Sequence, residues 1–153
     1  MKQLLIFLLC LTATHAQVAD KYETAAKKKW EDTIKEFEQL DRTTDYPAES
    51  ILFMGSSSIR LWSTLAQDMA PHPVIQRGYG GAKFQDLAVF AERIVHPHEF
   101  RAVAIFVAND IVGKNDSDLT PDEVAALYAD VVKTVREKNA KAPVFLIAIT
   151  PTQ

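Results

Sequence analysis

The chain has 153 residues and a mass of 17.1 kDa, which suffices for one domain of ordinary size. With 48% hydrophobic and 24% charged residues, its composition is that of a globular protein and excludes a disordered or fibrous chain. Seventeen Lys and Arg against 20 Asp and Glu give a net charge of -3, which argues against nucleic acid as the main partner. The single cysteine excludes a disulfide framework and a thiolate metal site within the chain.

Residues 1–16 are predicted to be a signal peptide. A basic start at Lys2 leads into an apolar run over residues 4–11, and small residues precede Ala16. This run is much shorter than the ~20 residues that a membrane-spanning helix needs. We therefore expect cleavage after Ala16, a secreted or periplasmic protein, and no transmembrane segment in the mature chain.

The segment that follows has the pattern of an amphipathic helix. Apolar residues recur at steps of three and four from residue 20 to about residue 40, and they are Tyr22, Ala26, Trp30, Ile34 and Phe37. We assign residues 17–45 to this helix and a linker, and residues 46–153 to the main domain.

Short apolar strands then alternate with helices. Strands are predicted over residues 51–54, 74–77, 102–107 and 144–149, and helices over 58–69, over 84–94 and from Thr120 onward. Thr120 and Glu123, with Pro121 between them, form a capping box that starts the last helix. This alternation predicts an α/β fold, a three-layer flavodoxin-like sandwich with a parallel sheet.

Polar and glycine residues follow the first three predicted strands. They are Ser56 to Ser58, Gly78 to Gly81, and Asn109 with Asp110. Ligands of open parallel sheets bind at the carboxyl ends of the strands, so we expect these groups to share one edge. His72, His96 and His98 precede strands and belong to the opposite edge.

Each group taken alone has a simpler interpretation. The serines fit a helix cap or an anion cradle, Gly80 and Gly81 fit a turn, and Asn109 fits a loop cap. The spacing of Asp110, Asp116 and Asp118 fits no calcium loop and favours a solvated loop.

Taken together and in order, these segments resemble the conserved blocks of the GDSL, or SGNH, hydrolases. Residues 51–62 (ILFMGSSSIRLW) resemble the first block in its Gly-Ser-Ser subgroup, residues 77–81 (RGYGG) the second, and residues 109–110 (ND) the third. The resemblance implies a serine esterase or acylhydrolase in which Ser57 is the nucleophile. It also implies an oxyanion hole made of the Ser57 N–H, the Gly81 N–H and the Asn109 side chain, with no metal or organic cofactor. The substrate it implies is a small-molecule ester, an acylated carbohydrate or a lipid.

The chain departs from the family pattern in three places. Ser56 stands where most members have Asp, and Val107 stands where the third block usually has Gly. The Asp-x-x-His block that supplies the catalytic acid and base is absent, so we expect the chain to be a C-terminally incomplete fragment. The alternatives are an inactive binding module on the same fold and a flavodoxin-like anion binder. The sequence makes no prediction of oligomeric state.

Three aromatic residues near these blocks have two interpretations. Trp62, Tyr79 and Phe84 fit either an aromatic wall for the substrate or packing in the core.

Overall fold

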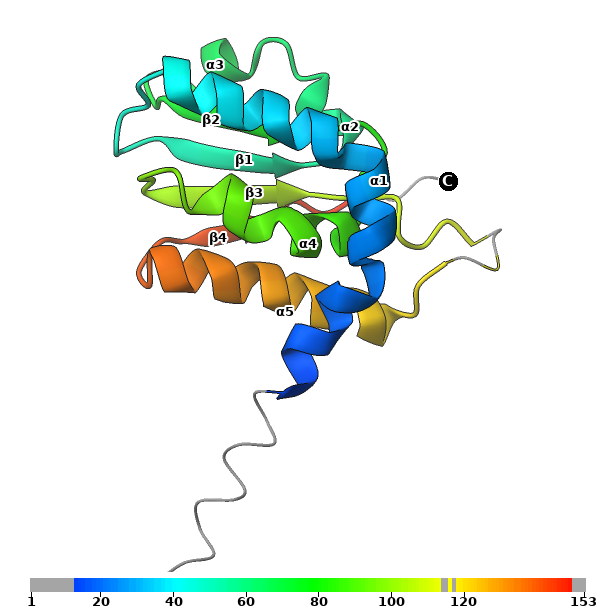
Figure 1. The fold of residues 1–153 in the computed structure, drawn as a ribbon. Coiled ribbons are helices and arrows are strands. Elements are labelled where there is room, and N and C mark those ends of the chain that lie inside the picture. The colour runs from blue at the N-terminus through cyan, green and yellow to red at the C-terminus, as the bar shows by residue number, and fades with distance from the viewer. Residues whose placement is uncertain (1–12, 114–115, 117, 150–153) are drawn as a thin grey trace, which may run out of the picture.

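The computed structural model describes residues 13–113, 116 and 118–149, which form an α/β fold around a four-stranded sheet (Figure 1). The strands are β1 (Ile51–Gly55), β2 (Val74–Gly78), β3 (Ala102–Phe106) and β4 (Val144–Leu146). Every pairing is parallel and the order is β2-β1-β3-β4, which is how a flavodoxin-like sheet begins. The predicted fold class is confirmed.

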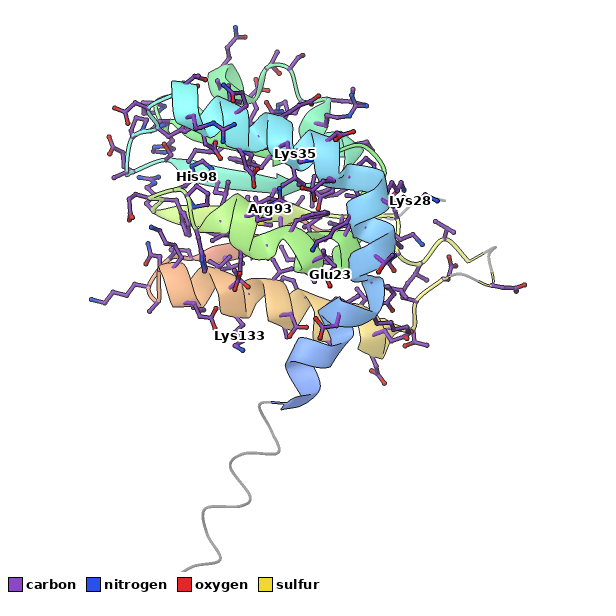
Figure 2. All side chains as sticks on the ribbon, in the orientation of Figure 1. Glu23, Lys28, Lys35, Arg93, His98 and Lys133 are labelled. Atoms are coloured by element: carbon purple, nitrogen blue, oxygen red, sulfur yellow. The ribbon has the colours of Figure 1, made fainter. Side chains whose placement is uncertain are left out.

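One face of the sheet is covered by three helices that lie side by side in Figure 1. They are α1 (Ala13–Thr43), α4 (Phe84–Val95) and α5 (Pro121–Lys138). Alternate β1 residues, Leu52 and Met54, are fully buried against this layer, as the two-residue period of a strand requires. Arg93 of α4, labelled in Figure 2, links α4 to α1 by ion pairs of 2.9 Å to Glu31 and 2.7 Å to Glu38.

The opposite face carries two short helices over β1 and β2. They are α2 (Ser57–Arg60) and α3 (Leu65–Asp68). Ile51 and Phe53 of β1 pack there with Ile59 and Leu65. The edge strand β4 has no such cover in the described part of the chain, and the Phe145 side chain is 57% exposed.

The helix predicted over residues 58–69 is instead split into α2 and α3. The Gln76 side chain of β2 explains the break, because its Nε2 donates to the carbonyls of Ile59 at 2.5 Å and Trp62 at 3.1 Å. The chain turns between the two helices, and Asp68 of α3 then accepts hydrogen bonds of 2.6 Å from both Trp62 Nε1 and Thr64 Oγ1.

The fourth strand is also shorter than predicted. It ends at Leu146 rather than at residue 149, although the Ile147 N–H still donates to the Ile105 carbonyl at 2.9 Å. The next carbonyl of β3, that of Phe106, accepts the Ser56 N–H instead.

The structure tests only some of the predictions for the N-terminal segment. Helix α1 confirms the amphipathic helix, and its residues Ala26 and Ile34 belong to the main core. Residues 1–12 of the predicted signal peptide lie outside the described residues, so export, cleavage after Ala16 and the division at residue 45 stay predictions. None of the helices that the structure describes has the length and apolar character needed to cross a membrane.

Candidate active site

The loops that follow β1, β2 and β3 meet at the carboxyl edge of the sheet, as predicted. Backbone hydrogen bonds join them, because the Tyr79 N–H donates to the Gly55 carbonyl and the Ser56 N–H to the Phe106 carbonyl, both at 3.0 Å. Since β1 lies between β2 and β3, the turn that carries Ser56 to Ser58 lies between the other two loops. The three segments are therefore neighbours in space.

Ser57 is the first residue of α2 and is half-buried, whereas the preceding Ser56 is buried. Backbone hydrogen bonds hold the turn, since the carbonyls of Ser56 and Ser57 accept the N–H groups of Arg60 at 3.1 Å and Leu61 at 2.8 Å. Among the described residues, the Ser57 N–H donates to no backbone carbonyl outside the helix. This N–H remains available to an anionic oxygen of a ligand.

The glycine loop, residues Gly78 to Gly81, packs against α2, and its one aromatic residue is buried in the core. A Cβ on Gly78 would lie 2.4 Å from the Arg60 nitrogen, so no larger residue fits there. Tyr79 is fully buried, and its ring meets that of Trp30 of α1 edge-on at 5.2 Å. Gly81 follows with φ +81°, a conformation that favours glycine, and its surroundings are open.

Asn109 connects the loop after β3 to the glycine loop. Its Nδ2 donates to the Ala82 carbonyl at 3.1 Å, one residue beyond Gly81. An amide nitrogen carries two N–H groups, so this bond fixes the side chain and leaves a second donor. The next residue, Asp110, is buried and accepts the Phe84 N–H at 2.9 Å, and burial raises the pKa of its carboxyl.

The histidines of the main domain lie at the opposite edge, as predicted. His72 and His96 precede β2 and β3, and Figure 2 shows His98 at the end of the sheet far from α2. His98 is buried with its Nε2 3.5 Å from the Asp41 carboxylate, and that carboxylate also pairs with the buried Arg77. None of the three therefore lies beside Ser57.

Sequence reasoning missed the burial of Arg77. This cation packs over the rings of Phe37 at 5.3 Å and Tyr46 at 5.1 Å, beneath α1. The only signal was an arginine inside an apolar strand, and its partner Asp41 is remote in the sequence. Arg77 holds the end of α1 against the strand from which the glycine loop starts.

The idea of an aromatic wall for the substrate is wrong for two of the three residues. Tyr79 is fully buried and Phe84 is 4% exposed, so both belong to the core. Trp62 is half-buried and its ring packs against Phe53 at 5.8 Å.

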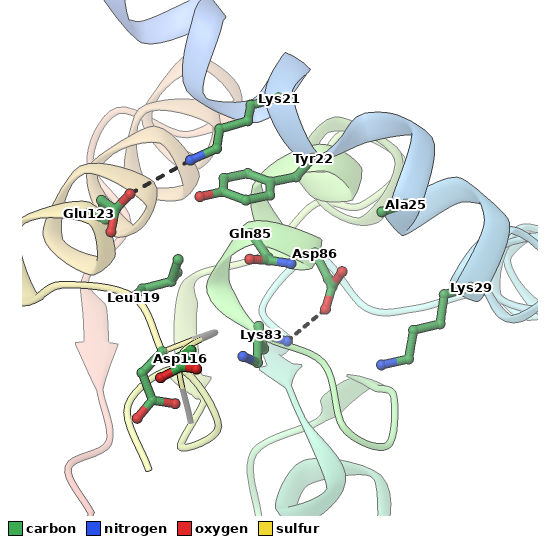
Figure 3. Close-up of a pocket in the computed structure, with 11 residues that line it drawn as sticks. Lys21, Tyr22, Ala25, Lys29, Lys83, Gln85, Asp86, Asp116, Leu119 and Glu123 are labelled. Carbon is green, nitrogen blue, oxygen red and sulfur yellow. Dashed lines mark hydrogen bonds and ion pairs between the residues drawn. The ribbon is translucent and has the colours of Figure 1, made fainter. Parts of the chain in front are cut away.

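A cleft of about 480 Å³ lies near the glycine loop, between α1, the start of α4 and the loop that precedes α5 (Figure 3). Its walls carry both charges, among them Lys21 and Glu123 in an ion pair of 3.7 Å. Lys83 lines the cleft, but Ser57, Gly81 and Asn109 do not. Within the described ranges, no group of three or more His, Cys, Asp or Glu side chains is placed to hold a metal ion.

The fold is similar to that of three solved structures from bacteria. A candidate platelet activating factor from Streptococcus pneumonia matches with a TM-score of 0.67 and 18% identity, over 91% of this chain and 62% of that one. A GDSL-like lipase from Bacteroides thetaiotaomicron matches with a TM-score of 0.61 and 19% identity, over 74% of this chain and 56% of that one. A candidate acylhydrolase from Bacteroides fragilis matches with a TM-score of 0.61 and 22% identity, over 73% of this chain and 55% of that one.

These matches establish a shared fold. This chain spans between 55% and 62% of the length of the three structures. No model of a known protein family matches it, and neither does any curated protein.

Proposed function

We propose that the chain carries the nucleophile and the oxyanion hole of an exported GDSL-type, or SGNH-type, hydrolase of carboxylic esters. One observation carries the proposal: the loops of Ser57, Gly81 and Asn109 follow three adjacent parallel strands and are joined by hydrogen bonds. The shared fold with a GDSL-like lipase and a candidate acylhydrolase supports it. Small esters, acylated carbohydrates and lipids are the substrates we expect.

In this mechanism Ser57 Oγ attacks the carbonyl carbon of the ester while a base takes the hydroxyl proton. The carbonyl oxygen becomes an oxyanion. It accepts hydrogen bonds from the backbone N–H groups of Ser57 and Gly81 and from the second N–H of the Asn109 amide. The C–O bond then breaks, the alcohol leaves with the proton, and water hydrolyses the acyl-serine. Each oxyanion donor is worth about 10²- to 10³-fold in turnover.

The mechanism needs a base that the described residues do not supply. His72, His96 and His98 lie at the far edge of the sheet, and His98 is buried against Asp41. We therefore propose that the histidine comes from an Asp-x-x-His segment that follows Gln153 in the natural protein. The three similar structures are longer than this chain, which is consistent with this source.

Ser57→Ala in the natural full-length protein tests the nucleophile. We expect hydrolysis of 4-nitrophenyl acetate to fall to background, because no other hydroxyl of the turn takes the place of Ser57 Oγ. Ser58→Ala is the matched control, since Ser58 is the exposed neighbour in the same helix and is expected to keep wild-type turnover. Undiminished hydrolysis in Ser57→Ala would contradict the assignment.

The position of the histidines favours one alternative, a binding module on the same fold that does not turn over esters. That protein would bind acylated carbohydrates without Ser57-dependent hydrolysis. Binding of an acetylated sugar that leaves its ester intact, in the natural full-length protein, would support this function instead.

A further inference from the structure

Arg60, the last residue of α2, is a cation beside the proposed oxyanion hole. Its backbone position is fixed, because its N–H donates to the Ser56 carbonyl at 3.1 Å and its nitrogen is in contact with the glycine loop at Gly78. The side chain reaches across that loop. A Cβ built on Gly80 would lie 2.8 Å from Arg60 Nε and 3.2 Å from Nη2. The guanidinium therefore rests against the residue that precedes Gly81.

This guanidinium is exposed and makes no ion pair or hydrogen bond with any residue that the structure describes. Arg77 and Arg93 are engaged, because Arg77 pairs with Asp41 and Arg93 pairs with Glu31 and Glu38. Arg101, at the opposite edge, also has no side-chain partner among the described residues. Two buried acidic groups at the same edge of the sheet as Arg60 already have partners.

These two acidic groups are Asp110 and Asp86. Asp110 accepts the Phe84 N–H and is buried, so burial raises the pKa of its carboxyl. Asp86 is also buried and accepts the Lys83 N–H at 2.9 Å. Among the described residues, no acidic side chain therefore forms an ion pair with Arg60.

We propose that the Arg60 guanidinium binds a carboxylate or phosphate group carried by the ester substrate, and so selects anionic esters. The inference rests on the proposed function of Ser57. An arginine presents a planar fork of donors that matches two oxygens of such an anion, and a site on the protein surface avoids the cost of burying the charge. The glycine loop brings the fork next to Gly81, where the ester carbonyl is held.

The test compares matched pairs of esters with the natural full-length protein at low salt. For an anion on the acyl side, the pair is 4-nitrophenyl acetate and 4-nitrophenyl hemisuccinate. For an anion on the alcohol side, the pair is phenyl acetate and 4-carboxyphenyl acetate. We expect wild-type protein to favour the anionic member of one pair in kcat/KM, and the pair concerned identifies the side on which the anion lies.

The variants are Arg60→Gln, Arg60→Lys and Arg101→Gln. We expect Arg60→Gln to raise KM for the anionic ester about 2- to 5-fold, the range for an exposed ion pair, and to leave kcat/KM for the neutral ester unchanged. Arg60→Lys keeps the charge without the fork and is expected to restore part of the loss. Arg101 is also exposed but precedes β3 at the opposite edge, so Arg101→Gln is expected to match wild type.

A second readout needs no turnover. In the Ser57→Ala background, the intact hemisuccinate or 4-carboxyphenyl ester is titrated by calorimetry with and without Arg60→Gln. If Arg60→Gln leaves the affinity for the anionic ester unchanged, or if the preference for the anionic ester in kcat/KM persists in Arg60→Gln, the role of Arg60 is overturned. Hydrolysis of the neutral ester that persists in Ser57→Ala would count against the proposed function alone.

Discussion

Asn109 joins two loops of the candidate site through a single hydrogen bond, from its Nδ2 to the Ala82 carbonyl. Asn109→Ala removes both this bond and the proposed oxyanion donor. We expect kcat for a neutral ester to fall about 10²- to 10³-fold with KM little changed, because the donor acts on charge that develops in the transition state. The stability loss should be only about 1 kcal/mol, as for one hydrogen bond.

Asn139 provides the control for this change. Its Nδ2 donates to the Phe100 carbonyl at 2.8 Å and its Oδ1 accepts the Lys141 and Ala142 N–H groups at 3.2 Å, so Asn139→Ala deletes side-chain hydrogen bonds far from Ser57. This variant is expected to lose more stability than Asn109→Ala and to keep wild-type kcat. Steady-state kinetics and urea unfolding of both variants separate the two effects. Wild-type kcat in Asn109→Ala would exclude the amide from the oxyanion hole.

The residue scale also shows what the sequence could and could not predict. Ser57, Gly81 and Asn109 were placed correctly at one edge because strand order and direction follow from the pattern of elements. Arg77 was not recognised as buried, because its ion pair with Asp41 bridges segments that only the folded chain brings together. The same holds for Tyr79, whose contact with Trp30 depends on where α1 docks.

At the scale of elements, Gly55 sets how closely β1 and β3 approach at the site. It has φ +148°, and a Cβ there would lie 2.0 Å from the Phe106 carbonyl oxygen. Gly55→Ala is therefore expected to lower the free energy of unfolding by about 3 kcal/mol or more, through backbone strain and overpacking together.

Gly113→Ala isolates the contribution of backbone strain. Gly113 also has a positive φ, +73°, but a Cβ there meets nothing within 4 Å. We expect this variant to lose only about 1–2 kcal/mol. Equal losses for the two variants in urea unfolding would mean that the contact with Phe106 carries no cost.

The pattern of apolar residues predicted where most elements begin, but it missed one break in a helix. Helices α4 and α5 and the first three strands begin within one residue of their expected starts, because each has a clear buried stripe or apolar run. The break between α2 and α3 was missed, since it depends on Gln76, a residue of another strand.

At the scale of the whole molecule, His98 links stability to pH. It lies among groups from several elements: Asp41 of α1, Arg77 of β2 and Lys138 of α5, with the Tyr46 ring packed against it. Burial lowers the pKa of His98 below its ordinary value of 6.5, and Arg77 and Lys138 act in the same direction while Asp41 opposes them. The neutral imidazole is therefore the form that the folded state favours.

A lowered folded-state pKa makes the unfolded chain take up the proton first as pH falls. The stabilisation that His98 contributes is thus fully present above about pH 6.5 and is lost as pH drops through the folded-state pKa. We expect the free energy of unfolding to fall more steeply between pH 7.5 and pH 5 in wild type than in His98→Gln. Parallel slopes in urea unfolding at a series of pH values would show that His98 does not titrate differently on folding.

The central claim is that Ser57 is a nucleophile at the carboxyl edge of the sheet. The most direct measurement treats the natural full-length protein with a fluorophosphonate and locates the adduct by peptide mass spectrometry. We predict a single phosphonyl group on Ser57, with none on Ser58 and none in the Ser57→Ala variant. An unmodified Ser57 in a protein that hydrolyses esters, or an adduct on another residue, would contradict this account.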